Sequence, residues 1–293
     1  MRIVFIGTVE FSRRALERLL AMHAEIVGVC TLQDSKFNAD HVDLGAISEA
    51  HRLPWFYAED INSTEALSWI QDKAPDVIFC FGWSRLLKQD LLRLAPWGVV
   101  GFHPATLPAN RGRHPLIWAL VLGLEKTAST FFFMDEGADS GDILSQREIQ
   151  IDDEDDARIL YDKVTKTALE QIEEFVPMLA TGTFLRLNQN HMLANTWRKR
   201  GIADGIIDWR ISAHAIHNLV RGLTKPYVGA HFIVDGQEIK VWKSAVITNV
   251  PRNMEFGKVL TRTNFGPVVK CGEDAICLLT TEPSFEPVVG VYL

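Results

Sequence analysis

The chain has 293 residues, of which 47% are hydrophobic and 23% charged, and its formal net charge is −7. This length favours one large domain plus a smaller one, and the composition excludes a disordered chain. The negative charge disfavours a protein whose main task is to grip a phosphate backbone. Four cysteines lack paired metal-ligand spacing, so we expect buried, reduced thiols. The N-terminus shows no signal-like cleavage pattern, and we expect a cytoplasmic protein.

The first two thirds of the chain alternate between strand and helix patterns. This order predicts an α/β fold with a doubly wound, mostly parallel Rossmann-like sheet, whose ligand sites lie at the carboxyl ends of the strands. Strands are predicted at 2–6, 25–31, 76–81, 98–102, 129–133 and 143–150. Helices are predicted at 13–22, 42–51, 64–73, 86–94, 114–122 and 157–180.

The pattern changes beyond residue 187. A polar linker leads to one predicted helix at 212–222, and short strands with turns at 235–236 and 271–272 follow. We therefore predict a catalytic domain at 1–187, a linker at 188–204, and a small C-terminal β-barrel (OB-like) domain at 205–293.

Two features that resemble ligand sites are interpreted as structural. The turn after the first strand offers only Gly7, whereas a dinucleotide fingerprint needs three glycines there, so NAD(P) binding is disfavoured. The acidic run at 152–156 immediately precedes a long helical pattern, where carboxylates offset the helix macrodipole. No metal site is predicted.

A histidine and an aspartate each follow a predicted strand. His103 comes after the apolar run 98–102 and before a loop that Pro104 and Pro108 stiffen, while Asp139 lies in a glycine-punctuated loop after the strand at 129–133. A carboxylate near an imidazole fixes its tautomer and favours its protonated form, which suits general acid/base chemistry. The spacing alone does not distinguish hydrolysis from group transfer.

Two motifs around these residues resemble the signatures of folate-dependent formyltransferases. The segment HPATLPANRG at 103–112 is similar to H-x-S-L-L-P-x-x-R-G, and MDEGADSGD at 134–142 is similar to M-D-x-G-x-D-T-G-D. The segments at 204–209 and 226–230 resemble the start of the C-terminal barrel of methionyl-tRNA formyltransferases. The resemblance implies an enzyme that transfers the formyl group of 10-formyltetrahydrofolate to a primary amine.

The resemblance also implies roles for individual residues. His103 would stabilise the tetrahedral intermediate by hydrogen bonding or proton transfer, and Asp139 would orient His103 and help accept the proton of the amine. Which of the two is the formal base stays open. Gly101 stands where the family usually has an asparagine that binds the developing oxyanion. Either another donor substitutes, for example Asn110, a backbone N–H or a water, or the activity is reduced or altered.

The other implied site residues form two groups. The residues expected to bind the folate are Phe81, Gly82, Trp83, Leu86, Leu107, Pro108, Met134, Asp135, Gly137 and Ala138. The residues expected to contact the acceptor substrate are Thr8, Glu10, Phe11, Arg111, Gly112 and Arg113.

The acceptor is predicted from charge. Methionyl-tRNA formyltransferases carry a basic insertion after the second strand, whereas this chain has QDSKFNADHVD at 33–43. Together with the net charge, this loop favours a small acceptor. In this respect the chain resembles bacterial sugar N-formyltransferases of the pseudaminic-acid-pathway type. Arg111, Arg113 and the basic run at 198–200 are candidates to meet a diphosphate, although solvated surface charge is the simpler interpretation of that run.

We therefore predict an N-formyltransferase that acts on the primary amine of a nucleotide-linked amino sugar, with no nucleic-acid or membrane partner. The oligomeric state, including a homodimer, is left open. Three alternatives remain: a methionyl-tRNA formyltransferase, a 10-formyltetrahydrofolate hydrolase, and a non-catalytic folate-binding protein.

Overall fold

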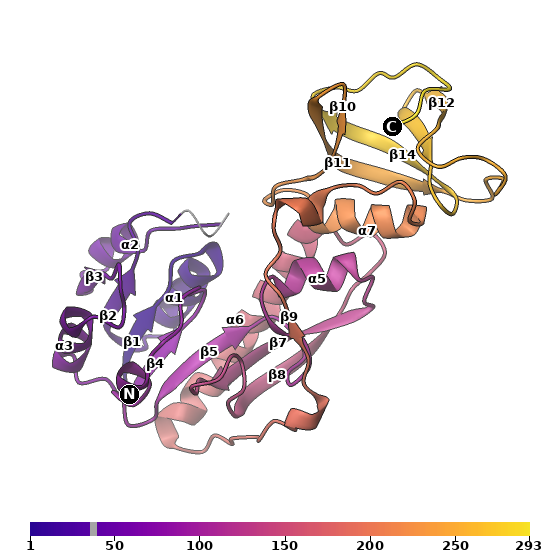
Figure 1. The fold of residues 1–293 in the computed structure, drawn as a ribbon. Coiled ribbons are helices and arrows are strands. Elements are labelled where there is room, and N and C mark those ends of the chain that lie inside the picture. The colour runs from indigo at the N-terminus through magenta and orange to yellow at the C-terminus, as the bar shows by residue number, and fades with distance from the viewer. Residues whose placement is uncertain (36–39) are drawn as a thin grey trace. The chain divides into compact units, whose positions relative to one another are not determined.

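The computed structural model describes residues 1–35 and 40–293, which fall into two compact units (Figure 1). Unit 1 comprises Met1–Gly112, Ala128–Ile149 and Lys163–Thr196, and unit 2 comprises Arg113–Thr127, Gln150–Asp162 and Trp197–Leu293. Two stretches within the predicted first domain, 113–127 and 150–162, thus group with the C-terminal part of the chain.

Unit 1 is built on a seven-stranded sheet with the strand order β3-β2-β1-β4-β5-β7-β8. The first five strands in this order pair in parallel, and β7 runs antiparallel to β5. This arrangement confirms the predicted mostly parallel, doubly wound fold class. The strands are β1 (Arg2–Ile6), β2 (Glu25–Thr31), β3 (Trp55–Tyr57), β4 (Val77–Cys80), β5 (Val99–His103), β7 (Lys126–Phe133) and β8 (Ile143–Gln150).

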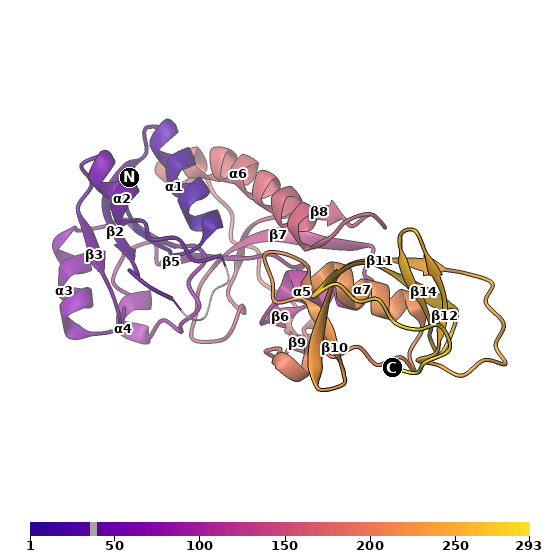
Figure 2. The ribbon, with the colours of Figure 1, turned by 90° about the horizontal axis from the view of Figure 1, so that it is seen from above.

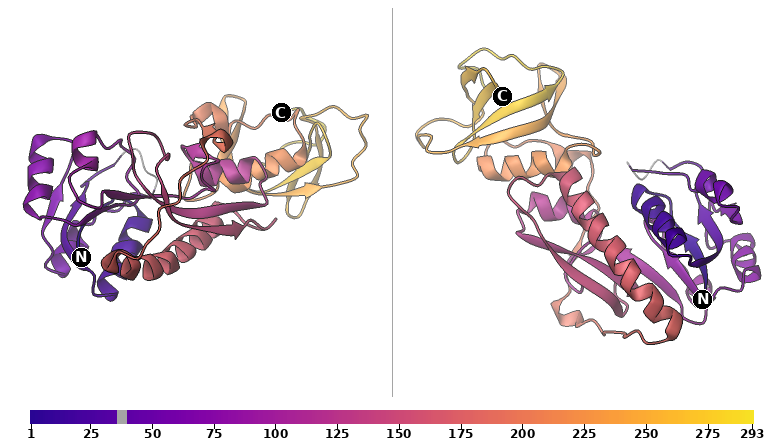
Figure 3. Two further views of the ribbon diagram at one scale, coloured as in Figure 1. Left: turned by 90° about the horizontal axis from the view of Figure 1, so that it is seen from below. Right: turned by 180° about the vertical axis from the view of Figure 1, so that it is seen from behind.

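Helices cover both faces of this sheet. Figure 2 shows α1 and α6 on one side of the strands and α3 and α4 on the other, and the right panel of Figure 3 shows α1 and α6 in front of the strands. Strands that are buried on both faces read as continuous apolar runs, which is why the sequence revealed them. The helices are α1 (Glu10–Ala21), α2 (Gly45–Ala50), α3 (Thr64–Asp72), α4 (Gln89–Leu92) and α6 (Ala157–Thr181).

The two faces differ in the side chains that pack there. On the face of α1 and α6, the rings of Phe81 and Phe131 lie 5.2 Å apart, and Phe175 of α6 lies 4.8 Å from Phe131. On the face of α3 and α4, aliphatic side chains such as Ile70 and Leu91 pack against the strands. The phenylalanine face is therefore a rigid aromatic layer beneath the strand ends.

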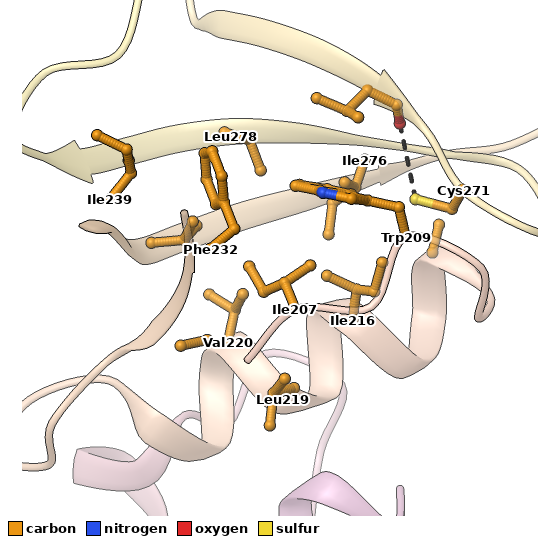
Figure 4. Close-up of a cluster of buried hydrophobic side chains, with 14 of the residues drawn as sticks. Ile207, Trp209, Ile216, Leu219, Val220, Phe232, Ile239, Cys271, Ile276 and Leu278 are labelled. Atoms are coloured by element: carbon orange, nitrogen blue, oxygen red, sulfur yellow. Dashed lines mark hydrogen bonds between the residues drawn. The ribbon is translucent and has the colours of Figure 1, made fainter. Parts of the chain in front are cut away.

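Unit 2 contains a five-stranded antiparallel sheet with the order β10-β11-β14-β13-β12. Figure 4 shows side chains of α7, among them Ile216 and Val220, directed toward Phe232 and Leu278 of the sheet, and all four are buried. The elements are α5 (Pro115–Val121), α7 (Ala213–Leu223), β10 (Ala230–Val234), β11 (Gln237–Ile247), β12 (Val259–Thr263), β13 (Gly266–Lys270) and β14 (Ala275–Glu282). Four further short elements are β6 (Arg111–Gly112) and η1 (His191–Leu193) in unit 1, β9 (Thr196–Trp197) at the boundary in the chain between the units, and η2 (Ile202–Gly205) in unit 2.

Helix α5 belongs to unit 2 because it packs closely on α7. A Cβ atom added to Gly222 of α7 would lie 3.2 Å from Leu120 Cβ and 3.2 Å from Val121 Cγ2 of α5. Ile117 of α5 is also part of the buried cluster of unit 2. A glycine at this crossing thus allows the two helices to approach, and this contact ties the stretch 113–127 to the C-terminal segment.

The acidic run at 152–156 immediately precedes α6 and caps it. Asp156 Oδ1 accepts the backbone N–H groups of Arg158 and Ile159, each at 2.9 Å, which is an N-cap arrangement. Arg221 Nη1 donates to backbone carbonyls of the run, including that of Asp155 at 3.0 Å.

Within residues 1–35 and 40–293, no group of three or more His, Cys, Asp or Glu side chains is placed to hold a metal ion. None of the described helices is long and apolar enough to cross a membrane.

Replacing Asp156 with alanine should lower the free energy of unfolding by about 1 kcal/mol, because two N–H groups at the start of α6 lose their acceptor. Urea unfolding followed by circular dichroism measures the change. Asp153→Ala, at an exposed carboxylate of the same run, is the matched control and should change the free energy by less than about 0.5 kcal/mol. Equal losses in the two variants would contradict the capping role.

Candidate active site

The structure brings His103 and Asp139 together at the carboxyl edge of the sheet in unit 1. His103 is the last residue of β5 and is 5% exposed, and its Nδ1 lies 3.6 Å from Asp139 Oδ2. This separation is longer than a hydrogen bond and short enough for an ion pair when the imidazole is protonated. The sequence analysis placed His103 just after the strand, whereas the structure pairs it with Thr130 of β7.

Both nitrogens of the His103 ring face hydrogen-bond acceptors. Nε2 lies 2.8 Å from the backbone oxygen of Asn110, and because a carbonyl can only accept, this nitrogen carries the proton and donates. Nδ1 faces the carboxylate of Asp139. A neutral imidazole has one N–H and can serve only one of these acceptors, whereas the imidazolium form serves both. The Nε2–H bond thus fixes the ring with Nδ1 directed at the Asp139 carboxylate.

The loop that carries Asp139 is stabilised by hydrogen bonds among its own residues. Asp135 Oδ1 accepts the N–H of Gly137 at 3.0 Å and the hydroxyl of Ser140 at 2.6 Å. A Cβ atom on Gly141 would lie 1.8 Å from the backbone oxygen of Phe133, so only glycine fits there. Asp139 itself has a φ of +53°, in the left-handed region that non-glycine residues seldom adopt. The glycine-rich motif thus forms a compact turn that projects residue 139.

Contacts from other segments fix Asp139. Its Oδ2 accepts the N–H of Gly112 at 2.9 Å, and its backbone oxygen accepts Gln189 Nε2 at 2.9 Å. The loop after His103 is held from β7 and β8, because Ala105 O accepts the hydroxyl of Thr130 at 2.7 Å and Leu107 O accepts Gln146 Nε2 at 2.9 Å. The two motifs therefore meet as one site.

The position of Gly101 is filled by a neighbouring side chain. Gly101 is opposite Phe132 in the ladder between β5 and β7, and a Cβ atom there would lie 2.8 Å from Met134 Cγ. An asparagine at this position would have to displace the Met134 side chain. The proposed substitute donor Asn110 has its backbone oxygen bonded to His103 and its N–H bonded to Asn195 Oδ1 at 2.7 Å.

The predicted folate residues lie at the ends of β4, β5 and β7 and in the loops that follow. Phe81 is fully buried, so its ring supports the site from inside the core. Gly82 has a φ of +70°, and a Cβ there would lie 2.2 Å from Val9 Cγ2. Leu86 is 77% exposed, while the indole Nε1 of Trp83 is buried and has no hydrogen-bond partner. Leu107 and Met134 share a small apolar cluster with Phe132 and Ile143. Pro108, Asp135, Gly137 and Ala138 lie in the two loops of the site.

The residues predicted to contact the acceptor are spread over both units. Thr8 is buried and its hydroxyl bonds to His41 Nδ1 at 2.9 Å, and Phe11 is buried in the aromatic layer. Arg111 Nη2 donates to Gln189 Oε1 at 2.6 Å and to His191 Nδ1 at 3.0 Å. Glu10 begins α1. Gly112 bonds to Asp139, and Arg113 belongs to unit 2.

The loop at 33–43, whose charge led to the prediction of a small acceptor, is described in part, because residues 36–39 lie outside the described residues. The basic run at 198–200 lies in unit 2 and is largely engaged within it. The guanidinium of Arg200 lies 4.6 Å from the centre of the Trp118 ring, and Arg198 Nη1 donates to Asp204 Oδ2 at 2.8 Å. Both arginines of the run thus have partners in the same unit.

Sequence reasoning did not find Gln189 and Asn195, which lie in the predicted linker at 188–204. Gln189 is 6% exposed and bonds to Asp139 and Arg111, and Asn195 Oδ1 accepts the N–H of Asn110. Their partners are about 50 to 85 positions away along the chain. The only signal is an amide-rich stretch, which by itself is typical of a solvated loop.

Gly101→Ala should lower the free energy of unfolding by about 1 to 3 kcal/mol, because the new methyl group overlaps Met134. The loss should be smaller when the same change is made in a Met134→Ala background, and a double-mutant cycle in urea measures the difference. Gly201→Ala, where a Cβ meets nothing within 4 Å, is the control. The same loss in both backgrounds would contradict the overlap.

Two domains of a known protein family match the N-terminal and the C-terminal parts of the chain. Residues 1–176 match the family described as formyl transferase, and residues 202–287 match the formyl transferase C-terminal domain. The chain is 32% identical to the methionyl-tRNA formyltransferase of Caldanaerobacter subterraneus subsp. tengcongensis, over 99% of this chain and 95% of that protein. It is 30% identical to the methionyl-tRNA formyltransferase of Geobacter metallireducens, over 94% of this chain and 89% of that protein.

Solved structures show the same fold at low sequence identity. The crystal structure of WlaRD, a sugar 3N-formyl transferase, superimposes with a TM-score of 0.73 and 17% identity over 97% of this chain and 99% of that chain. The methionyl-tRNA formyltransferase from Clostridium thermocellum superimposes with a TM-score of 0.61 and 19% identity over 84% of this chain and 94% of that chain. Such likenesses establish the architecture and do not distinguish between acceptors.

The predicted acceptor, a nucleotide-linked amino sugar, is wrong by this comparison. Four curated relatives that are 30 to 32% identical over 93 to 99% of the chain are named methionyl-tRNA formyltransferase. The prediction rests on the net charge and on the loop at 33–43. Neither of these describes the charge of the surface that binds the acceptor.

Proposed function

The chain belongs to the formyl transferase family, and from this premise we propose that it formylates the amino group of methionyl-tRNA. The formyl donor is 10-formyltetrahydrofolate. The observation that carries the choice of acceptor is the identity of 30 to 32% to methionyl-tRNA formyltransferases over 93 to 99% of the chain.

The proposed chemistry uses the two groups at the carboxyl edge of the sheet. The amine nitrogen attacks the formyl carbon, the carbonyl oxygen becomes an oxyanion, and the bond from that carbon to N10 of the folate then breaks. The amine loses a proton and N10 gains one, so the reaction needs no further reactant. His103 stabilises the oxyanion by a hydrogen bond, for which its Nε2–H exchanges the Asn110 carbonyl for the oxyanion. Asp139 holds the ring and accepts the proton of the amine.

The indole of Trp83 supports a polar ligand at the predicted folate residues. Its Nε1 is a buried donor without a hydrogen-bond partner, and buried donors are normally satisfied. A carbonyl or ring nitrogen of the folate would satisfy it. The exposed Leu86 side chain is an apolar surface in the same loop, as binding of an aromatic ring system requires.

The net charge of −7 does not exclude an RNA acceptor. In unit 2, the pKa of His114 is lowered first by burial and further by the positive charges of Arg113, Lys199 and Arg200. Three cations therefore lie near one histidine, together with the carboxylate of Asp204, and Arg200 itself is buried. Phosphates respond mainly to nearby charges, so an acidic chain can still bind RNA where its exposed cations outnumber the carboxylates around them.

The acceptor is tested by incubating the protein with 10-formyltetrahydrofolate and methionyl-tRNA and detecting formyl-methionine by mass spectrometry. We expect formyl transfer that depends on both substrates. No transfer to methionyl-tRNA would overturn the acceptor, and tetrahydrofolate release without any amine would support hydrolysis instead.

The two side chains are tested by His103→Ala and Asp139→Asn. Each should lower kcat at least about a hundredfold, the usual scale for a group that moves or holds a proton in the transition state. Circular dichroism and binding of 5-formyltetrahydrofolate, an unreactive analogue, serve as controls for folding and donor binding. Rates near those of the wild type in both variants would contradict the mechanism.

A further inference from the structure

A buried amide side chain joins the two loops that carry His103 and Asp139. Gln189 lies in the segment between α6 and β9 and is 6% exposed. Its Nε2 donates to the backbone oxygen of Asp139 at 2.9 Å and to that of Gly141 at 2.7 Å. Its Oε1 accepts Arg111 Nη2 at 2.6 Å. One side chain therefore contacts the loop at 134–142 and the loop at 103–112 at the same time.

The chemistry of these partners requires glutamine. Backbone oxygens only accept hydrogen bonds, so the NH₂ group must face Asp139 and Gly141, while a guanidinium only donates, so the oxygen must face Arg111. Glutamate lacks the two donors, and lysine lacks the acceptor. Asparagine is one methylene shorter. The orientation of the amide is thus determined by its surroundings at both ends.

Asp139 depends on such contacts for its position. Its φ of +53° is unfavourable for a residue with a side chain, so the loop keeps this conformation only when its neighbours enforce it. Gly112 holds the carboxylate and Gln189 holds the backbone oxygen. Without the second contact the carboxylate would be free to move away from His103.

We propose that Gln189 is a positioning residue for the His103–Asp139 pair and acts through the backbone of residue 139. This inference rests on the proposed function, because it takes the His103–Asp139 pair as the catalytic centre for formyl transfer. Gln189 touches neither reacting group directly. Its loss should therefore reduce kcat and leave the KM for the donor nearly unchanged.

The test is Gln189→Glu, which keeps the shape and the acceptor for Arg111 but replaces both donors with oxygen. We expect kcat for methionyl-tRNA to fall at least about tenfold, since displacement of a catalytic group by about 1 Å can cost about a hundredfold. The KM for 10-formyltetrahydrofolate should stay within about twofold. Gln189→Met, of similar length and without charge, should also lower kcat and leave the KM for 10-formyltetrahydrofolate unchanged. It covers the case in which the glutamate variant does not fold.

Asn190→Asp is the matched control. It makes the same change from amide to carboxylate at the next residue, which is exposed and uses its oxygen to accept the N–H of Met192 at 3.1 Å. Aspartate keeps that acceptor, so kcat should equal that of the wild type. An equal loss of kcat in Asn190→Asp and Gln189→Glu would overturn the specific role of Gln189.

Hydrogen exchange tests the inference without any turnover. The Gly112 N–H donates to Asp139 Oδ2, so its exchange should accelerate in Gln189→Glu and Gln189→Met, together with that of residues 139–141, while exchange in β1 and α1 stays unchanged. This readout remains valid if the wild type fails to formylate methionyl-tRNA, which would overturn only the proposed function. Unchanged exchange at Gly112, or equal acceleration throughout unit 1, would overturn the positioning role.

Discussion

The site depends on how the imidazole of His103 is held at the end of β5. The ring is buried, its Nε2 bonds to the Asn110 carbonyl at 2.8 Å, and its Nδ1 lies 3.6 Å from the Asp139 carboxylate. The carboxylate is the group that faces Nδ1, so it fixes the orientation of the ring. The position of Asp139 therefore decides what His103 can do, and the surrounding loops are arranged to fix that position.

The register of β5 is fixed by the residue between Gly101 and His103. Phe102 packs into the aromatic layer, with its ring 4.2 Å from that of Phe11 and 5.0 Å from that of Phe131. Neighbouring residues of a strand point to opposite faces, so Gly101 and His103 face away from this layer. A slip by one residue would put His103 into the aromatic layer, and the packing of Phe102 prevents it.

The sequence predicts most of the sheet and only part of the site. The apolar patterns predict β1, β2, β8 and α6 to within one residue, whereas β7 begins three residues before its predicted start. The sequence does not predict β3, because three residues, Trp55–Tyr57, are too few to show a pattern. The two motifs predict that His103 and Asp139 meet. The strand ends do not, because β7 runs antiparallel to β5 and its last residue, Phe133, pairs with Val100. The contacts of Gln189 could not follow, because they connect residues 50 positions apart through a segment without regular structure. Such contacts exist only after the sheet has brought β5, β7 and that segment together.

The wrong acceptor has a physical explanation in the range of electrostatic forces. A net charge of −7 sums the whole chain, whereas at physiological ionic strength charges more than about 8 Å apart are largely screened in water. The acidic run at 152–156 contributes five carboxylates to that sum, and part of the run caps α6. Elsewhere in unit 2, the positive charges of Arg113, Lys199 and Arg200 act on His114, and the carboxylate of Asp204 opposes them. A phosphate responds mainly to the charges near it and not to the sum over the chain. Local charge, which requires the fold, is therefore the quantity that bears on an RNA acceptor.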